Sequence, residues 1–223
     1  MKNITLFLLL GLFVLLSGCS YPKVWVEGEV TNSPMIMPMY DKKWVLVEDL
    51  EFTFWDEKKP QKEYKITVPA GFVMDLASIP AGPNVIFSNY GQYATAGIIH
   101  DFLYWTNPDC KGEGDGRRIA DKLYRDVMEI YNVSRSVRWA QYFGLWLWGQ
   151  HAWDKNKKLR ESGESRYLAR KYWKHVNPSA KWSKLKKDYA TKQACWEKET
   201  NETDCRIEKE NICGIKTYKK IDN

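Results

Sequence analysis

The chain has 223 residues, of which 44% are hydrophobic and 14% aromatic, and its formal net charge is +6. This is the composition of a globular protein, and it excludes a chain too polar to build a core. The length is sufficient for one domain with an appendage, and the eleven tryptophans are unusually many.

The N-terminal sequence predicts a secretory signal peptide. Residues 1–3 are a short, positively charged start, and residues 4–16 are almost without a polar side chain, a run too short to span a bilayer stably. The sequence Leu-Ser-Gly-Cys at 16–19 resembles the lipobox of bacterial lipoproteins. The resemblance implies that residues 1–18 are removed, that Cys19 carries lipid, and that the gene is bacterial or from a phage. The alternative is an ordinary signal that contains a cysteine by chance.

A lipobox places the protein in the cell envelope, anchored through the lipid on Cys19. Only residues 20–22 separate Cys19 from the first predicted strand, a reach of roughly 10–14 Å. Ser20 stands where an aspartate would resemble an inner-membrane retention signal. We therefore expect the periplasmic face of the outer membrane if the host is Gram-negative.

Three segments after the anchor predict strands of a small antiparallel sheet. Residues 23–31 and 64–68 alternate apolar with polar side chains, which is typical of strands with one wet face. Residues 44–55 carry Trp and Phe at further strand positions. The turn residues Pro69-Ala70-Gly71 end the last strand.

Three helices are predicted next. Residues 93–105 are apolar on nearly every side, which indicates a buried helix. Residues 117–131 carry an apolar stripe that includes Leu123 and Val127. Ser134 can cap a third helix over 135–153.

The third helix is rich in tryptophan, and its aromatic residues have two interpretations. Trp139, Phe143 and Trp146 recur at helical spacing and are most simply core residues. Trp148 and Trp153 extend beyond that stripe and could rest at a bilayer interface, where indole is favoured.

We place a boundary near Lys155, between an α+β domain at 19–154 and a basic extension at 155–223. Residues 155–192 contain thirteen Lys or Arg against three acidic residues. In an envelope lipoprotein such a segment favours anionic lipid headgroups or another acidic envelope polymer, and no nucleic acid is expected. The alternative is a solvated basic helix face without a partner.

The mature chain retains four cysteines, which are Cys110, Cys195, Cys205 and Cys213. Exported cysteines meet an oxidising compartment, and an even number fits two disulfides with three alternative pairings. The predicted fold class is therefore α+β: a small antiparallel sheet, a three-helix cluster with a central buried helix, and a basic, disulfide-bearing C-terminal extension.

The candidate site centres on His100 and Asp101 in the apolar helix. Burial of both groups costs several kcal/mol unless each finds a partner. Tyr104 shares a face with His100, and two further carboxylates, Asp75 and Asp121, are placed to meet them. The set supports a metal site, for calcium or zinc, or an acid/base histidine oriented by a carboxylate.

The structural alternative for the same residues is a satisfied buried network. In that interpretation Asp75 or Asp121 hydrogen-bonds His100 or caps a helix. The charge of Asp121 is then neutralised by Arg118 and Arg125.

Three motifs carry a family resemblance. They are VPAGFVMDLASIP at 68–80, AGIIHDFLY at 96–104 and Ala-Asp at 120–121. Together they resemble the signature of the domain-of-unknown-function family 1353, which is common in phages and prophages, over roughly residues 45–150. The resemblance implies a phage context and supplies no catalytic residues, because no activity is established for the family.

The string His-Asp-Phe-Leu-Tyr at 100–104 is similar to the H-D-x-C-Y string of secreted phospholipases A2, with Leu103 in place of the cysteine. That resemblance implies that His100 activates water and that Asp101 helps hold calcium. The glycine-rich calcium loop of those enzymes precedes the helix, whereas the candidate loop here, residues 109–116, follows it.

Two functions compete. The first is a phage- or prophage-type envelope lipoprotein that binds or modifies a host-envelope component, for superinfection exclusion or virion assembly. The second is a metal-assisted envelope hydrolase that uses His100 with Asp75, Asp101 or Asp121. The first is favoured, since no reaction-specific motif is present.

Overall fold

The structure is a computed structural model, and it describes residues 25–30, 33–56, 59–76, 93–107, 116–191 and 216–219. The signal peptide and the lipidated cysteine predicted at Cys19 lie outside these residues. The four cysteines expected to form disulfides also lie outside them, so their pairing stays a prediction.

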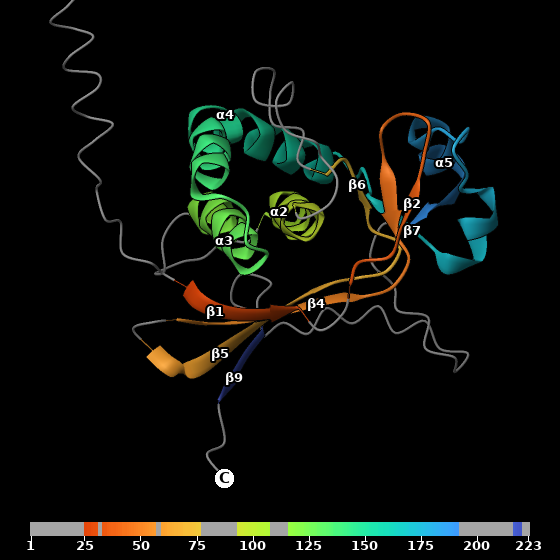
Figure 1. Ribbon diagram of the computed structural model, residues 1–223. Coiled ribbons are helices and arrows are strands. Elements are labelled where there is room, and N and C mark those ends of the chain that lie inside the picture. The colour runs from red at the N-terminus through yellow and green to blue at the C-terminus, as the bar shows by residue number, and fades with distance from the viewer. Residues whose placement is uncertain are drawn as a thin grey trace, which may run out of the picture.

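The chain adopts a mixed α+β fold, as predicted, with small antiparallel sheets followed by packed helices (Figure 1). The main sheet has the strand order β1-β4-β5-β9. Its strands are β1 (Trp25–Val30), β4 (Leu50–Asp56), β5 (Lys59–Val68) and β9 (Lys216–Lys219). In the β4–β5 pair, Phe52 lies opposite Ile66 and Phe54 opposite Tyr64, and all four side chains are buried. The main sheet thus has the one apolar face that its alternating sequence predicts.

The segment 44–55, predicted as one strand, is two strands. β3 (Trp44–Leu46) ends before a short turn, and β4 begins at Leu50. The Asp49 carboxylate lies in this turn and accepts a hydrogen bond from the backbone N–H of Ala70 at 2.8 Å. This bond holds the segment between β3 and β4 against the residues that follow β5.

A second sheet, with the order β2-β3-β6, has side chains from both faces in apolar cores. Its other strands are β2 (Ile36–Pro38) and β6 (Val73–Met74). Leu46 of β3 and Met74 of β6 pack in the main core. Their neighbours Val45 and Val73 pack in a second core on the other face of the sheet. Because successive strand residues point to opposite faces, this small sheet separates the two cores.

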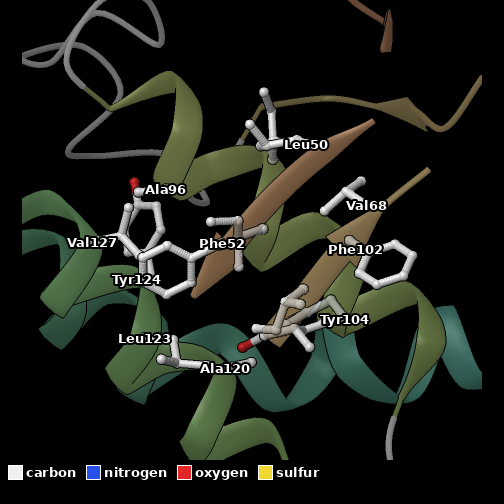
Figure 2. Close-up of a cluster of buried hydrophobic side chains, with 14 of the residues drawn as sticks. Leu50, Phe52, Val68, Ala96, Phe102, Tyr104, Ala120, Leu123, Tyr124 and Val127 are labelled. Carbon is white, nitrogen blue, oxygen red and sulfur yellow. The ribbon is translucent and has the colours of Figure 1, made fainter. Parts of the chain in front are cut away.

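The helical part consists of α2 (Ala94–Thr106), α3 (Gly116–Ile130) and α4 (Arg135–Glu161). α2 is buried at every residue from 95 to 105, as its apolar sequence predicts. In Figure 1, α2 and α3 lie between the main sheet and α4. Side chains from β4, β5, α2 and α3 meet in the main core (Figure 2).

α4 buries a different side from the one predicted. Phe143 and Trp146, expected in the core, are 55% and 57% exposed, whereas Trp153, considered for a bilayer interface, is buried. The buried residues of α4 include Gly144, Leu145 and Gly149. Glycine lets the helix backbone approach α2 and α3 closely, so the small residues face inward and the large ones outward.

The ends of α4 also differ from the prediction. The helix continues to Glu161 instead of ending near Trp153. Ser134 occupies the N-cap position, but its hydroxyl makes no capping hydrogen bond. The boundary expected near Lys155 therefore falls within a continuous helix, and the division into 19–154 and 155–223 stays a prediction.

The first part of the basic extension is folded. It contains β7 (Tyr167–Leu168), the 3-10 helix η2 (Arg170–His175), α5 (Trp182–Tyr189) and β8 (Ala190–Thr191). The N–H of Val73 donates to the Arg166 carbonyl at 2.7 Å, and the N–H of Leu168 donates to the Gly71 carbonyl at 2.9 Å. Gly71 has φ +85°, and a Cβ there would lie 2.3 Å from the Leu168 carbonyl oxygen. The extension therefore packs on the glycine of the VPAGF motif.

In the part of the chain that the structure describes, no helix combines the length and the apolar character needed to cross a membrane.

Candidate functional site

α2 presents its polar residues in two directions. His100 and Tyr104, four residues apart, lie on the side that faces α3. Asp101 is rotated by about 100° from His100 around the helix axis and meets the backbone of Asp75 instead. All three side chains on α2 are buried.

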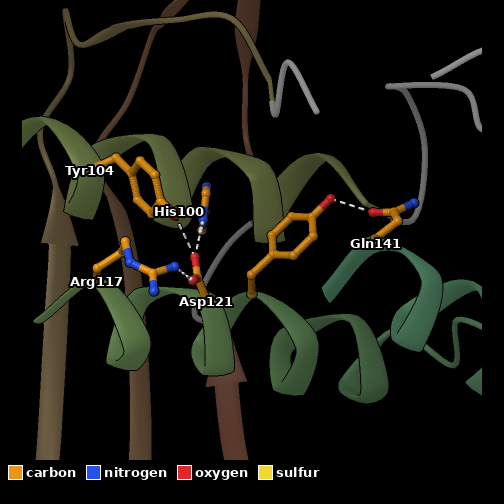
Figure 3. Close-up of polar contacts among 6 residues, drawn as sticks. His100, Tyr104, Arg117, Asp121 and Gln141 are labelled. Carbon is orange, nitrogen blue, oxygen red and sulfur yellow. Dashed lines mark hydrogen bonds and ion pairs between the residues drawn. The ribbon is translucent and has the colours of Figure 1, made fainter. Parts of the chain in front are cut away.

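Asp121 of α3 joins His100, Tyr104 and Arg117 in one network, which we call the Asp121 cluster (Figure 3). The Tyr104 hydroxyl donates to Asp121 Oδ1 at 2.6 Å. His100 Nε2 lies 3.1 Å from the same oxygen and acts as the donor, because a carboxylate only accepts. Arg117 Nη1 donates to Asp121 Oδ2 at 2.8 Å.

Both oxygens of the Asp121 carboxylate are paired within the cluster. Asp121 is only 2% exposed, and a buried carboxylate needs the hydrogen bonds and the opposite charge that its three neighbours supply. Burial, together with the negative charge of Asp121, raises the pKa of Tyr104 above its ordinary value, so the hydroxyl remains a donor. Gly149 of α4 packs against the cluster, where a Cβ would lie 2.4 Å from the Tyr104 hydroxyl.

Aromatic rings surround the imidazole of His100. Its ring centroid lies 4.1 Å from that of Tyr104 and 5.1 Å from that of Tyr124. The Tyr124 hydroxyl in turn donates to Gln141 Oε1 on α4. These contacts connect α2, α3 and α4 through polar groups inside an otherwise apolar core.

Asp75 and Asp101 form a second, separate pair. The N–H of Asp75 donates to Asp101 Oδ2 at 3.1 Å. Asp75 Oδ2 lies 2.7 Å from Lys43 Nζ, and these two side chains are 24% and 27% exposed. The Asp75–Asp101 pair therefore has one buried carboxyl group and one that reaches the surface.

The pKa values of the two carboxyl groups shift in opposite directions. Burial and the nearby charge of Asp75 raise the pKa of Asp101 to about 8. Burial also opposes ionisation of Asp75, but the charges of Lys43 and Arg166 outweigh it and lower the pKa of Asp75 to about 2. At neutral pH Asp101 thus keeps a proton, which it shares with the Asp75 carboxylate.

The structure divides the predicted site into two groups. His100, Tyr104 and Asp121 come together, while Asp75 and Asp101 do not join them. The hydrogen bond expected between Asp121 and His100 is present.

The charge of Asp121 is neutralised by Arg117, not by the expected arginines. Arg125 pairs with Asp126, and Arg118 is exposed. Within the described ranges, no three His, Cys, Asp or Glu side chains are grouped to hold a metal ion such as the calcium or zinc considered above.

Several residues of these networks were not predicted from the sequence. Arg117 had a usable signal, because it lies four residues before Asp121 on the same helix. Lys43, Gln141, Gly149 and Arg166 had none, since their contacts depend on how distant elements pack.

The fold and both networks define an α+β domain with a polar, helix-linking core. Residues 44–145 match the family model described as "Protein of unknown function (DUF1353)". The match contains all four residues of the Asp121 cluster and both residues of the Asp75–Asp101 pair. Searches of curated proteins and of solved structures gave no match.

Proposed function

We propose that the protein is a lipid-anchored envelope lipoprotein of phage or prophage type, which acts by binding an envelope component at the membrane surface. The observation that carries this proposal is the closed geometry of the Asp121 cluster. A general base must come within about 3 Å of the proton that it removes, yet His100 is 4% exposed and donates to a buried carboxylate. The cluster is better suited to joining helices than to chemistry.

The exposed charge of the folded extension supports a binding role. Nine Lys or Arg side chains between residues 155 and 188 are exposed, against two acidic ones, Glu161 and Asp188. The exposed cations are Lys155, Lys157, Lys158, Arg170, Lys171, Lys174, Lys181, Lys184 and Lys187. A surface of this kind attracts anionic headgroups with about 1 kcal/mol for each cation near the membrane.

The anchor is tested by fractionation. Wild-type protein should sediment with membranes and incorporate labelled fatty acid, whereas Cys19→Ala should do neither. Recovery of Cys19→Ala with membranes at low salt and its release at high salt would still agree with binding through the basic surface. A wild-type protein that takes up no fatty acid would contradict the proposal.

The binding role is tested against hydrolysis with the purified lipidated protein. It is incubated with phospholipid vesicles and with cell-wall material, with and without calcium or zinc, and the products are identified by mass spectrometry. We expect no released product. Product that forms with the wild type and is lost in a folded His100→Gln variant would establish the hydrolase instead.

Two further variants check the structural role of the Asp121 cluster. Asp121→Asn weakens the ion pair with Arg117 inside the core, and we expect a loss of about 2–4 kcal/mol in the free energy of unfolding. Tyr104→Phe removes one hydrogen bond and should lose only about 1–2 kcal/mol. An unchanged stability in Asp121→Asn, measured by urea denaturation, would contradict a structural role.

One observation keeps the hydrolase as a second candidate. Asp75 is partly exposed and ionised beside Asp101, which holds a proton, and carboxyl groups with separated pKa values are typical of acid–base pairs. In this case Asp75→Asn should abolish any product formation while His100→Gln leaves it unchanged. Loss with His100→Gln alone would place the chemistry at the Asp121 cluster.

A further inference from the structure

The positive charge of the folded extension is concentrated on η2 and α5, and α5 lies at the end of the molecule remote from α3 (Figure 1). Six exposed cations, which we call the extension cations, lie on these two elements and at the N-cap of α5: Arg170, Lys171, Lys174, Lys181, Lys184 and Lys187. Between residues 165 and 191 the only acidic residue in the sequence is Asp188. The exposed lysines of α4, in contrast, lie among the exposed Asp154 and Glu161, so the excess of charge there is small.

The extension cations keep their charge uncompensated. No ion pair joins one of the six to an acidic side chain in the part of the chain that the structure describes. Lys186 of α5 differs from them, because its Nζ lies 2.6 Å from Glu164 Oε2. Three of the six lie over aromatic rings, at 4.9–5.5 Å from the ring centroid: Arg170 over Trp173, Lys171 over Tyr172, and Lys181 over Tyr40. A ring holds a cation without neutralising it, so the charge remains available to an anionic partner.

The side chains of the extension cations point in more than one direction. Arg170 and Lys171 are neighbours in a 3-10 helix, so they diverge by about 120°. Lys174 lies three residues after Lys171 and shares its side of η2. On α5, Lys184 and Lys187 are about 60° apart around the helix axis. A flat surface meets only one of the directions on η2, whereas a flexible chain reaches several.

The apolar side of α5 is already used inside the protein. Trp182, Leu185 and Tyr189 share one side of the helix and pack in the second core. The Tyr189 ring also stacks on Tyr172 and His175 of η2, at centroid distances of 4.6 and 4.7 Å. A helix that lies in a bilayer interface buries an apolar side, and α5 has none left. The extension cations therefore suit a partner that is recognised by its charge.

We propose that the extension cations bind a flexible polyanion of the cell envelope, with phosphate or carboxylate groups repeated along its chain. This inference rests on the proposed binding role and names the class of its partner. Each lysine or arginine that neutralises an anionic group on such a chain also releases a counterion. No aromatic ring of η2 or α5 is exposed, so bases find no stacking platform there, and a nucleic acid is a poorer fit.

The test uses the full lipidated protein in vesicles of phosphatidylcholine, so that the anchor is occupied and the membrane carries no net charge. The probes are fluorescently labelled polyphosphate and polygalacturonate, and the tighter of the two identifies the anionic group. About four to six contacts with a single chain predict a loss of roughly 50- to 300-fold in affinity between 50 and 200 mM salt. An affinity that does not respond to salt would contradict the proposal.

Two paired variants locate the contact. One combines Lys171→Gln with Lys174→Gln on η2, and the other combines Lys184→Gln with Lys187→Gln on α5. Each removes two contacts and should weaken binding by roughly 10- to 30-fold at 0.1 M salt. All four positions are exposed and without an ion pair among the described residues, so we expect the variants to fold as the wild type does, which circular dichroism checks.

The matched control removes the same charge from α4. Lys155→Gln combined with Lys157→Gln should change the affinity by less than about threefold, because Asp154 and Glu161 already offset the charge there. A control that loses as much affinity as the paired variants would show that the net charge of the protein, and not the extension cations, sets the binding.

Three further outcomes overturn the inference. Protein that stays with the vesicles and binds neither polymer is anchored without this partner. Full displacement of the polymer by added protein-free vesicles of phosphatidylglycerol, at an equal concentration of anionic groups, would assign the extension cations to the bilayer. Tighter binding of a single-stranded oligonucleotide would assign them to a nucleic acid. Loss of the protein from the vesicles contradicts the lipid anchor instead, and polymer binding is then measured in solution.

Discussion

Asp101 is a buried acid that keeps its proton at neutral pH, and this couples the stability of the fold to pH. Its native pKa of about 8 lies above that of an unfolded Asp. The native state therefore binds more protons than the unfolded chain between about pH 4 and pH 8, and the free energy of unfolding falls as the pH rises through this window. Asp126, whose pKa burial raises to about 6, acts in the same direction.

Asp75 has the opposite effect at lower pH. Its pKa of about 2 lies below the unfolded value, so its contribution to stability is present above about pH 4 and is lost as the pH falls toward 2. The three carboxyl groups together place maximum stability in mildly acidic solution.

Asp101→Asn should remove the largest part of this pH dependence. The Asn side chain has nearly the shape of the neutral Asp101 side chain, and its carbonyl oxygen can accept the hydrogen bond from the Asp75 N–H. Unlike Asp101, it carries no charge at high pH. We expect the variant to match the wild type near pH 5 and to be more stable by roughly 1–3 kcal/mol near pH 9. Urea denaturation at several pH values measures this, and an unchanged slope would contradict the shared proton.

Among the elements, α2 was predicted from the sequence and α4 was predicted only in part. A helix that is apolar on every side is expected to be buried, and α2 is buried from residue 95 to residue 105. For α4 the aromatic stripe predicted the wrong side. Hydrophobic periodicity finds the apolar residues but does not count glycine as a packing residue, although Gly144 and Gly149 are buried and Gly149 packs directly against the Tyr104 hydroxyl.

The C-terminal end of α2 depends on a residue far along the chain. α2 has no basic residue in its last turn. Instead, Arg160 of α4 donates to the carbonyl oxygens of Trp105, at 2.7 Å, and Thr106. A cation at this position pairs with free carbonyls and with the negative end of the helix dipole.

Arg160→Ala should therefore destabilise the protein by about 1–2 kcal/mol and speed hydrogen exchange in the last turn of α2. Arg160→Lys should lose less, because it keeps the charge. Lys157→Ala, an exposed neighbour on α4, should stay within about 0.5 kcal/mol of the wild type. Equal stabilities of Arg160→Ala and Lys157→Ala would show that the contact is unimportant.

Across the whole molecule, the two cores meet at the β2-β3-β6 sheet. The family match ends at residue 145, yet Leu168 and Trp182 of the extension fill the second core against Val45 and Val73. The sequence suggested a boundary near Lys155 because the composition changes there. A change in composition does not show that both faces of the short β2-β3-β6 sheet are apolar and must be buried by other segments.

Leu168→Ala should test whether the two cores unfold together. Leu168 is 2% exposed, so we expect a loss of about 2–4 kcal/mol. Because the cores share a sheet, the change should shift a single unfolding transition followed by near-UV circular dichroism. Leu147→Ala, at an exposed position on α4, serves as the control and should have little effect. Two transitions, of which only one shifts, would mean that the extension is an independent unit.

The shared sheet also leads to a prediction about the sequences of relatives of this chain. In a family member that stops where the match ends, positions 45 and 73 would face water, and we expect polar residues there. Where both stay apolar, the relative must cover them with a segment of its own, whatever its sequence. These two positions therefore indicate, from the sequence alone, which members of the family carry a second core.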